Sequence, residues 1–370
     1  MNYLDHLYIV VLCGGGGTRV WPLSVSKKPK QFLNFYSEKT LYQETVGRAK
    51  KLVSQEKIFI ITNQKYVDEI KQETPEIPTA NIIGEPEKKN TAMAMGTAAL
   101  YIKQKDPEAV IINLYSDHVI TNEDVFLNTL KISAQIAFED KCLMTIGVTP
   151  TFPHPGLGYI KMGEEIKKEH DLTITKVDSF KEKPDYETAK QYVESGKYLW
   201  NAGFYIWRVD QILQSFKDLS PNIYSKLAQL EQNLGKKNET VILKKVYQEV
   251  EDISIDFAIS EKSPNLCVVP GGFGWYDIGG WKVVYELGKK NENGNVLIKN
   301  KDGKQDIPAV SFDAKDNLVY YSHQPVALIG VENLVVVDTG EGLLICHKEK
   351  ANDVKKVVQE LQDKGYNDYV

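Results

Sequence analysis

Short apolar runs alternate with amphipathic stretches through the first part of the chain. The runs LYIVVLC, KIFIIT, AVIINLY and CLMTIGV have the length and composition of buried strands. Stretches such as LYQETVGRAKKL and EDVFLNTLKISAQIAFED follow them and carry apolar residues at helical spacing. This alternation predicts an α/β fold whose Rossmann-like, mixed, mainly parallel sheet is covered by helices on both faces. Ligands of such sheets bind at the carboxyl ends of the strands.

The pattern changes twice further along the chain. Beyond residue 150, the runs GYIKM, ITKVDSF and NAGFYIW predict more strands. Helices are expected from about Val209 to Lys262. One of them covers DISIDFAISEK, with Asp252 or Ser254 as its cap. From about Lys290, short strands parted by Gly, Asn and Asp predict a small β domain resembling a short left-handed β-helix, closed by an amphipathic helix. We therefore expect a catalytic domain over residues 1–288 and a β-solenoid-like domain over residues 289–370.

Composition and charge narrow the possible functions. The formal net charge of -5 argues against a general nucleic-acid binder, and the 42% hydrophobic content supports a sizeable core. Cys13, Cys142, Cys267 and Cys346 form no metal-binding or redox spacing, so they are expected to be reduced core residues. The first apolar run is too short to cross a bilayer. We expect a cytoplasmic protein with neither a nucleic-acid nor a membrane partner.

A glycine cluster follows the first predicted strand, in the stretch LCGGGGTRVWPLSVSKKPKQFL. Glycines there allow backbone amides to approach an anion, and Arg19 and Lys30 add positive charge. A P-loop is excluded because Thr18-Arg19 stands where Lys-Ser or Lys-Thr is required, and the dinucleotide-binding spacing of glycines is also missing. The loop is predicted to cradle phosphates in another way. A plain glycine turn with surface cations is the alternative.

The whole stretch resembles the signature GGxGTRLWPLS…PKQFL of the sugar-1-phosphate nucleotidylyltransferases, most of all the mannose-1-phosphate guanylyltransferase (GDP-mannose pyrophosphorylase) branch. Further segments are similar to motifs of that family and occur in the same order: GEPEKKNTAMA, YSDH, GLGYI, FKEKPD, WNAGFYIW, SIDFAISEK and GWYDIGGW. Any one of these matches is weak, but eight in order make a specific signal that covers roughly residues 7 to 285.

The resemblance implies a reaction and a set of residues. An oxygen of mannose 1-phosphate would attack the α-phosphorus of GTP, giving GDP-mannose and pyrophosphate. The resemblance assigns Asp117 and Asp277 to Mg²⁺ or another divalent cation, Arg19 and Lys30 to the triphosphate, and Lys183 to the sugar phosphate. Each has a simpler alternative: Asp117 as a cap or strand-end residue, Asp277 as a turn residue, and Lys183 as a solvated lysine.

The resemblance also implies which residues bind the nucleotide and the sugar. For the nucleotide the resemblance indicates Gly14, Gly15, Gly16, Gly17, Thr18, Glu85, Asn90, Thr91 and Ser116. For the sugar it indicates Gly158, Tyr159, Glu182 and Asn201. Glu85 or backbone carbonyls could accept the guanine donors, whereas Asn90-Thr91 could be a helix cap and Asn201 could pin a strand end. A homodimer is also expected, with the C-terminal β domain either packing on the catalytic domain or mediating dimerisation.

Several positions depart from the family pattern. Val25, Lys89 and Met93 replace the usual residues, and so do His154-Pro155 and Tyr276 close to the expected sugar pocket. These changes leave open a second hypothesis, that the enzyme transfers a nucleotide to a different sugar phosphate or uses a different base. A third hypothesis is a non-catalytic regulator that binds a sugar nucleotide. Retention of both aspartates and of the cations argues against it.

Overall fold

The computed structural model describes residues 2–15, 17–25, 27–35, 37–300 and 307–370. The chain divides into two compact units. The first comprises Met1–Cys13, Thr45–Ser116 and Ile120–Trp275, and the second comprises Gly14–Glu44, Asp117–Val119 and Tyr276–Val370. Each unit is described separately below. The chain passes from one unit to the other after Cys13 and after Ser116, and also within helix α1 (Leu41–Ala49) and the short strands β5 (His118–Ile120) and β11 (Trp275–Asp277).

The first unit is built on a nine-stranded sheet with the strand order β3-β2-β1-β4-β9-β6-β10-β8-β7. Its strands are β1 (Leu7–Cys13), β2 (Ile58–Asn63), β3 (Ile82–Glu85), β4 (Val110–Tyr115), β6 (Leu143–Val148), β7 (Tyr159–Glu169), β8 (Leu172–Lys181), β9 (Tyr198–Arg208) and β10 (Leu266–Gly271). The strands β3, β2, β1 and β4 run parallel, as do β6 and β10. Strand β9 is antiparallel to both β4 and β6. The expected mixed, mainly parallel sheet is confirmed.

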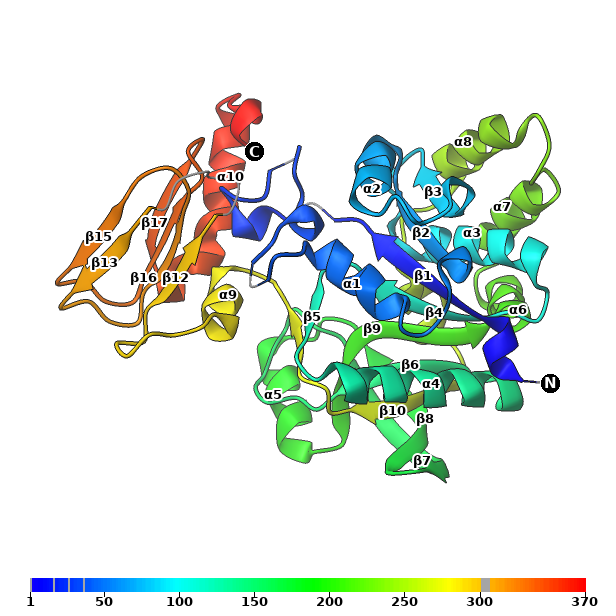
Figure 1. Ribbon diagram of the computed structural model, residues 1–370. Coiled ribbons are helices and arrows are strands. Elements are labelled where there is room, and N and C mark those ends of the chain that lie inside the picture. Colours follow the sequence, from blue (N-terminus) through cyan, green and yellow to red (C-terminus); the bar gives the residue numbers. More distant parts are fainter. Residues whose placement is uncertain (1, 16, 26, 36, 301–306) are drawn as a thin grey trace. The chain divides into compact units, whose positions relative to one another are not determined.

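Helices cover both faces of this sheet (Figure 1). They are α2 (Val67–Glu73), α3 (Asn90–Lys105), α4 (Glu123–Asp140), α5 (Tyr186–Ser195), α6 (Val209–Leu219), α7 (Pro221–Glu231) and α8 (Glu239–Glu249). Side chains that alternate along β9 take opposite faces, because neighbouring residues of a strand point to opposite sides. Phe204 packs on Phe126 of α4, whereas Tyr205 and Trp207 join the apolar core formed with α3, α6, α7 and α8.

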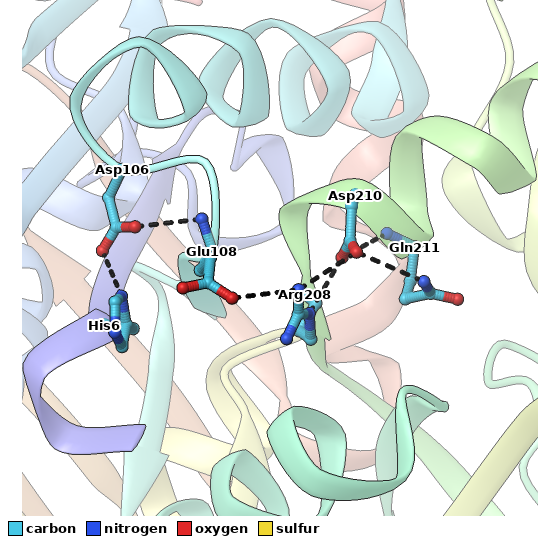
Figure 2. Close-up of polar contacts among 6 residues, drawn as sticks. All are labelled: His6, Asp106, Glu108, Arg208, Asp210 and Gln211. Atoms are coloured by element: carbon cyan, nitrogen blue, oxygen red, sulfur yellow. Dashed lines mark hydrogen bonds and ion pairs between the residues drawn. The ribbon is translucent and has the colours of Figure 1, made fainter. Parts of the chain in front are cut away.

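Polar contacts tie together the amino end of β1 and the carboxyl end of antiparallel β9 (Figure 2). His6 contacts Asp106 at 2.8 Å, and Arg208 binds Asp210 through Nε at 3.0 Å. The guanidinium of Arg208 also lies over the ring of Phe138, 5.4 Å from its centre, and His6 stacks on the same ring. This network lies at the end of the sheet opposite to the carboxyl ends of β1 and β4.

The second unit combines the glycine-rich segment with the C-terminal third of the chain. It contains α9 (Trp281–Leu287), β12 (Val296–Lys299), β13 (Ala309–Phe312), β14 (Leu318–Tyr321), β15 (Val326–Ile329), β16 (Leu334–Asp338), β17 (Leu343–His347) and α10 (Val354–Asp363). Val20, Trp21 and Leu33 share one apolar core with Trp281 of α9 and with residues of β14, β16 and α10. Trp281 donates a hydrogen bond to the carbonyl of Trp21 at 2.9 Å. The glycine-rich segment is therefore held by residues more than 240 positions away in sequence.

The C-terminal strands form the expected small β domain. Strands β12, β14 and β16 run parallel, β13 pairs in parallel with β15, and β17 closes the larger sheet antiparallel to β16. An asparagine precedes each strand of the parallel ladder: Asn295, Asn317 and Asn333. Asn317 donates to Oδ1 of Asn295 at 2.9 Å, and Oδ1 of Asn317 accepts the backbone N–H of Leu334. These buried amides fix the register from one turn of the chain to the next.

Two local expectations need correction. The helix expected over DISIDFAISEK is confined to a single π-helical turn at Asp256–Ser260, and its cap residue is Ile255 rather than Asp252 or Ser254. Strand β13 was not among the strands expected from the sequence. No helix among the described residues is long and apolar enough to cross a membrane. The domain boundary at residues 288 and 289 stays a prediction.

Candidate functional site

The glycine-rich loop begins directly after β1 and belongs to the second unit. Cβ atoms on Gly14 or Gly15 would meet nothing within 4 Å, so the backbone there is open. Gly17 is different: its φ is +58°, and a Cβ would lie 2.7 Å from Cβ of Lys30 and 2.6 Å from Oγ of Ser24. Glycine is required at this position, because it lets the loop lie against Lys30 in a left-handed conformation. Gly16 and the side chain of Thr18 lie outside the described residues.

Lys30 joins the two candidate metal ligands in the second unit. Its Nζ lies 3.0 Å from Oδ2 of Asp117 and 3.1 Å from Oδ1 of Asp277. The same Nζ donates to the carbonyl of Ile278 at 2.9 Å. A lysine ammonium has three hydrogens, so these three acceptors use all of its donors. Folding thus brings together the two aspartates, which are 160 positions apart in sequence, and directs Lys30 to them.

The electrostatics of this cluster favour charged side chains. Burial by itself would lower the pKa of Lys30, but the two carboxylates outweigh burial and raise the pKa above its ordinary value. Burial would raise the pKa of Asp277, yet Lys30 and the neighbouring His118 and Arg19 lower it to about 2. Asp277 is therefore a carboxylate at neutral pH, ready to bind a cation.

The arrangement suits a hard divalent cation. Among the described residues no group of three or more His, Cys, Asp or Glu converges on one point. Mg²⁺ needs fewer protein ligands, because it is usually bound through one or two carboxylates and completes its shell with water and substrate phosphates. Asp117 and Asp277 supply two carboxylates at a spot where a cationic Nζ already lies within hydrogen-bonding distance of both. They are the residues that would hold such an ion.

Arg19 lies beside the same turn of the chain. Its Nη1 is 3.3 Å from the position that a Cβ of Gly279 would take, and its side chain is exposed. The backbone N–H of Gly279 donates to the carbonyl of Asp277 at 2.7 Å, which makes a tight turn after the aspartate. An exposed guanidinium can bind a phosphate group in two-point fashion.

The predicted sugar residues come together in the first unit. A Cβ on Gly158 would collide with Oε2 of Glu182 and would lie 3.3 Å from Cβ of Asn201. The backbone N–H of Asn201 donates to the carbonyl of Gly158 at 2.8 Å. Tyr159 differs from the others: it is fully buried, and its hydroxyl accepts the N–H of His154 at 2.9 Å. Its side chain thus anchors the loop that contains His154-Pro155, where the sequence departs from the family pattern.

Glu182 and Lys183 stand at the edge of this group. Glu182 is largely buried and its carboxylate contacts Nζ of Lys183 at 2.8 Å, while the Lys183 side chain is 63% exposed. Burial raises the pKa of Glu182, and Lys183 works in the opposite direction. Lys183 adopts a positive φ of 46°, which is uncommon for a non-glycine residue and orients an otherwise solvated lysine. The site therefore offers a buried carboxyl group for hydroxyls beside an exposed cation.

The residues predicted for the base also lie in the first unit, on β3 and at the start of α3. Tyr247 of α8 donates to Oε1 of Glu85 at 3.1 Å. Burial raises the pKa of Glu85 to about 7, although the hydrogen bond from Tyr247 works in the opposite direction. Asn90 has a φ of +60°, and its Oδ1 accepts the N–H of the next residue, Thr91. The cap of α3 is Lys89, which makes no capping hydrogen bond with its side chain, so the simpler alternative of an Asn90 cap is not what the structure has. Thr91 accepts the backbone N–H of Ile255 at 2.9 Å.

Ser116 follows the last residue of β4 at the carboxyl edge of the sheet. It is 1% exposed, and its backbone N–H donates to the carbonyl of Leu12 at 3.0 Å. Its Oγ has no hydrogen-bond partner within the part of the chain that the structure describes. Nucleotide contact from Ser116 stays a prediction.

Three residues at these sites were given no role by reasoning from the sequence. Asp256 and Tyr205 contact Asn201, and Tyr247 contacts Glu85. Asp256 lies in the motif-like stretch SIDFAISEK, which is a signal that could have identified it. Nothing in the sequence around Tyr247 distinguishes it from an ordinary helical core residue.

Comparison with known proteins assigns the family. The model of a family described as nucleotidyl transferase matches residues 8–294. A second, described as MannoseP isomerase/GMP-like beta-helix domain, matches residues 308–361. The first match covers well over half of the chain, and the chain therefore belongs to the nucleotidyl transferase family. The expectation of a nucleotidyltransferase enzyme is confirmed, and so is that of a C-terminal domain resembling a β-helix.

Within this family the chain is similar to proteins named mannose-1-phosphate guanylyltransferase. One from Salmonella muenchen is 36% identical over 374 aligned residues, which cover 99% of this chain and 76% of the relative. One from Escherichia coli (strain K12) is 33% identical over 373, with 99% and 75% covered. The resemblance inferred from the motifs is confirmed. The chain spans about three quarters of the length of these relatives.

A solved structure supports the same grouping. The crystal structure named mannose-1-phosphate geranyltransferase from Thermus thermophilus has a TM-score of 0.84 and 28% sequence identity. The match covers 96% of this chain and 99% of that one. The similarity thus extends over both the large sheet and the C-terminal β domain.

Proposed function

We propose that this protein transfers GMP from GTP to mannose 1-phosphate, forming GDP-mannose and pyrophosphate. The observation that carries the reaction type is the convergence of Asp117 and Asp277 on one ammonium group, in the unit that also holds the glycine loop. The substrates are supported by relatives that cover nearly the whole chain and are named for mannose 1-phosphate and guanylyl transfer.

Atoms and charges balance in one displacement step. A phosphate oxygen of mannose 1-phosphate forms a bond to the α-phosphorus of GTP. The bond from this phosphorus to the oxygen that bridges it to the β-phosphorus breaks, and pyrophosphate leaves with the electron pair. Such transfers depend on alignment and on neutralisation of charge, with little covalent work for the protein. A divalent cation, Mg²⁺ or another, would be held by Asp117 and Asp277 and would supply further charge neutralisation.

The residues of the second unit bind and orient the triphosphate. Open amides at Gly14 and Gly15 donate to phosphate oxygens, and the exposed guanidinium of Arg19 binds two oxygens at once. Lys30 holds both carboxylates in place in this structure. We propose that it also stabilises the negative charge that develops on the triphosphate during transfer, since its charged form is favoured.

The residues of the first unit select the sugar and the base. Glu182 and Asn201 lie beside Gly158, whose missing side chain makes room for the Glu182 carboxylate, and they offer oxygen acceptors for hexose hydroxyls. Lys183 supplies an exposed positive charge next to them for the sugar phosphate. Glu85, the last residue of β3, or backbone carbonyls near it would accept the N–H groups of guanine.

The test is pyrophosphate release from the whole chain with Mg²⁺. GTP, ATP, UTP, CTP and dTTP are each paired with mannose 1-phosphate and with glucose 1-phosphate. We expect release with GTP and mannose 1-phosphate at a kcat/KM well above that of every other pair. Release with GTP but a different sugar would keep the mechanism and overturn the sugar, implicating the loop with His154-Pro155. No release from folded protein that still binds GTP would support the regulatory alternative.

We further propose that the protein acts as a homodimer in the cytoplasm, without a nucleic-acid or membrane partner. The face of the β13–β15 sheet exposes the apolar side chains of Val310, Phe312 and Ile329, of which Phe312 is 75% exposed. A second copy of the chain would cover them. The reduced, mostly buried cysteines fit a reducing compartment. Light scattering of the wild type and of Phe312→Asp tests the dimer, and identical masses for the two would refute this face.

A further inference from the structure

One carboxylate in the first unit organises the group of residues around Asn201. Oδ1 of Asp256 accepts a hydrogen bond from Nδ2 of Asn201 at 2.8 Å and another from the hydroxyl of Tyr205 at 2.7 Å. Both donors belong to β9, and Asp256 comes from a different segment more than 50 residues away in sequence. The carboxylate therefore fixes parts of the chain that the sequence does not place together.

The bond to Asp256 decides which way the amide of Asn201 faces. The two ends of an asparagine amide have nearly the same shape, so hydrogen-bond partners set its orientation. Here Nδ2 faces the carboxylate, and Oδ1 accepts the backbone N–H of Gly203 at 3.1 Å. Turning the amide over would point its oxygen at the carboxylate and lose both bonds. The second hydrogen of Nδ2 is directed to the hydroxyl of Tyr205 at 3.4 Å, so the group that Asn201 presents beside Gly158 is the remaining lone pair of Oδ1, held in a fixed orientation.

The backbone that carries Asp256 is itself constrained. Asp256 begins the π-helical turn Asp256–Ser260, a geometry that is rare and frequently found at functional sites. Just before it, the N–H of Ile255 donates to Thr91 Oγ1 at 2.9 Å, and the N–H of Ala92 donates to the carbonyl of Ile253. The start of α3 thus holds the segment from which the carboxylate reaches Asn201.

Tyr205 is suited to be a permanent donor to this carboxylate. Its ring is fully buried and stacks on Trp207 with ring centres 5.5 Å apart. Burial, reinforced by the negative charge of Asp256, raises the pKa of the Tyr205 hydroxyl well above its ordinary value. The hydroxyl therefore keeps its proton throughout the working range of pH, and Asp256 Oδ1 remains fixed between two donors.

We infer that Asp256 is a positioning residue for sugar selection: it orients the Asn201 amide so that this amide recognises hydroxyl groups of the sugar phosphate. The inference rests on the proposed function, because it assigns the role through the sugar subsite. The inference assigns a role to a residue of the stretch SIDFAISEK, to which the proposed reaction assigns none. Asp256 acts through Asn201 and makes no direct contribution to the displacement step.

The experiment compares steady-state kinetics of the full-length variants Asp256→Ala and Asp256→Asn with those of the wild type. In Asp256→Ala we expect the KM for mannose 1-phosphate to rise roughly tenfold, the equivalent of one hydrogen bond to a charged partner, while the KM for GTP stays within about twofold. The preference for mannose 1-phosphate over glucose 1-phosphate should fall by a similar factor. Asp256→Asn should stay close to the wild type, because its amide oxygen can accept both hydrogen bonds. Asp252→Ala, an exposed acid four residues earlier, is the matched control.

A double-mutant cycle with Asn201→Ala separates positioning from other roles. If Asp256 acts through Asn201, adding Asp256→Ala to Asn201→Ala should change the KM for the sugar phosphate by less than about twofold. Independent, multiplying effects would overturn the inference. So would an unchanged sugar KM with a lowered melting temperature, or a loss in Asp256→Asn as large as that in Asp256→Ala. If Asp256→Ala does not fold, Asp256→Ser takes its place, since its short hydroxyl cannot reach both donors. Failure of the wild type to use this substrate pair would overturn the proposed function instead.

Discussion

Glu85 gives a prediction whose size follows from burial. Its carboxyl group lies on β3, and burial raises its pKa from 4.5 to about 7. An acid with a higher pKa in the folded state binds its proton more tightly there than in the unfolded chain. The folded state consequently loses stability as the pH rises from about 4.5 to about 7, and the loss is constant above that range. At about 1.4 kcal/mol per unit of pKa shift, the full loss is roughly 3 kcal/mol.

The substitution Glu85→Gln removes this titration while keeping the shape of the side chain. The stability of Glu85→Gln relative to the wild type should therefore rise by roughly 3 kcal/mol between about pH 4.5 and about pH 7.5. Any constant effect of the substitution, such as a changed hydrogen bond to Tyr247, cancels when the difference is followed against pH. For a unit of this size, the melting-temperature difference should grow by about 6–12 °C over that range.

The assay is thermal unfolding of both proteins at half-unit steps of pH and constant ionic strength. Tyr247→Phe is the matched control: it removes the hydrogen bond that lowers the pKa of Glu85, so the transition in stability should move to higher pH. A difference between wild type and Glu85→Gln that does not change with pH would refute the reasoning, because it would mean that Glu85 is solvated. At about pH 8, Glu85→Gln should also raise the KM for GTP by roughly tenfold or more.

Three further predictions address the metal ligands, the sugar phosphate and the sheet. Asp277→Asn should reduce kcat by roughly a hundredfold or more in the pyrophosphate assay, since a charge that would hold the cation is lost, whereas the exposed control Asp368→Asn should keep full activity. The charge of Asp277 also stabilises the fold, because its pKa is lowered, so the melting temperature should fall as well and activities are compared below it. Lys183→Ala should raise the KM for mannose 1-phosphate and leave that for GTP unaltered; equal KM values in Lys183→Ala and in its neighbour control Lys181→Ala would contradict a phosphate contact. Arg208→Met should lower the free energy of unfolding, measured by urea denaturation, by roughly 2 kcal/mol, because Arg208 packs on Phe138 and binds Asp210. The control Lys217→Met changes an exposed residue and should lower it by less than about 0.5 kcal/mol.

The periodicity of the chain was sufficient for the architecture of the large sheet. Runs such as LYIVVLC and AVIINLY bury nearly every residue, and this pattern belongs to parallel strands covered on both faces. The β-helix-like domain was harder to predict from the sequence, because its strands are four or five residues long and its repeat is irregular. The asparagine before each of β12, β14 and β16 was present in the sequence. Only the three-dimensional structure shows that the first two of these residues, Asn295 and Asn317, are buried and hydrogen-bonded to each other, and that Asn317 also binds the start of β16.

The sequence by itself determined the family, and it singled out the glycine loop and the two aspartates as candidate site residues, because ordered motifs and a glycine cluster are local features. The tertiary structure alone decided which partners those residues meet. Lys30 reaches Asp117 and Asp277, Tyr247 reaches Glu85, and Asp256 reaches Asn201 across separations of tens to hundreds of residues. The physical reason is that a hydrogen bond or an ion pair depends on distances of a few ångströms. Such distances are set by the packing of the sheets and helices, and spacing along the chain does not record them.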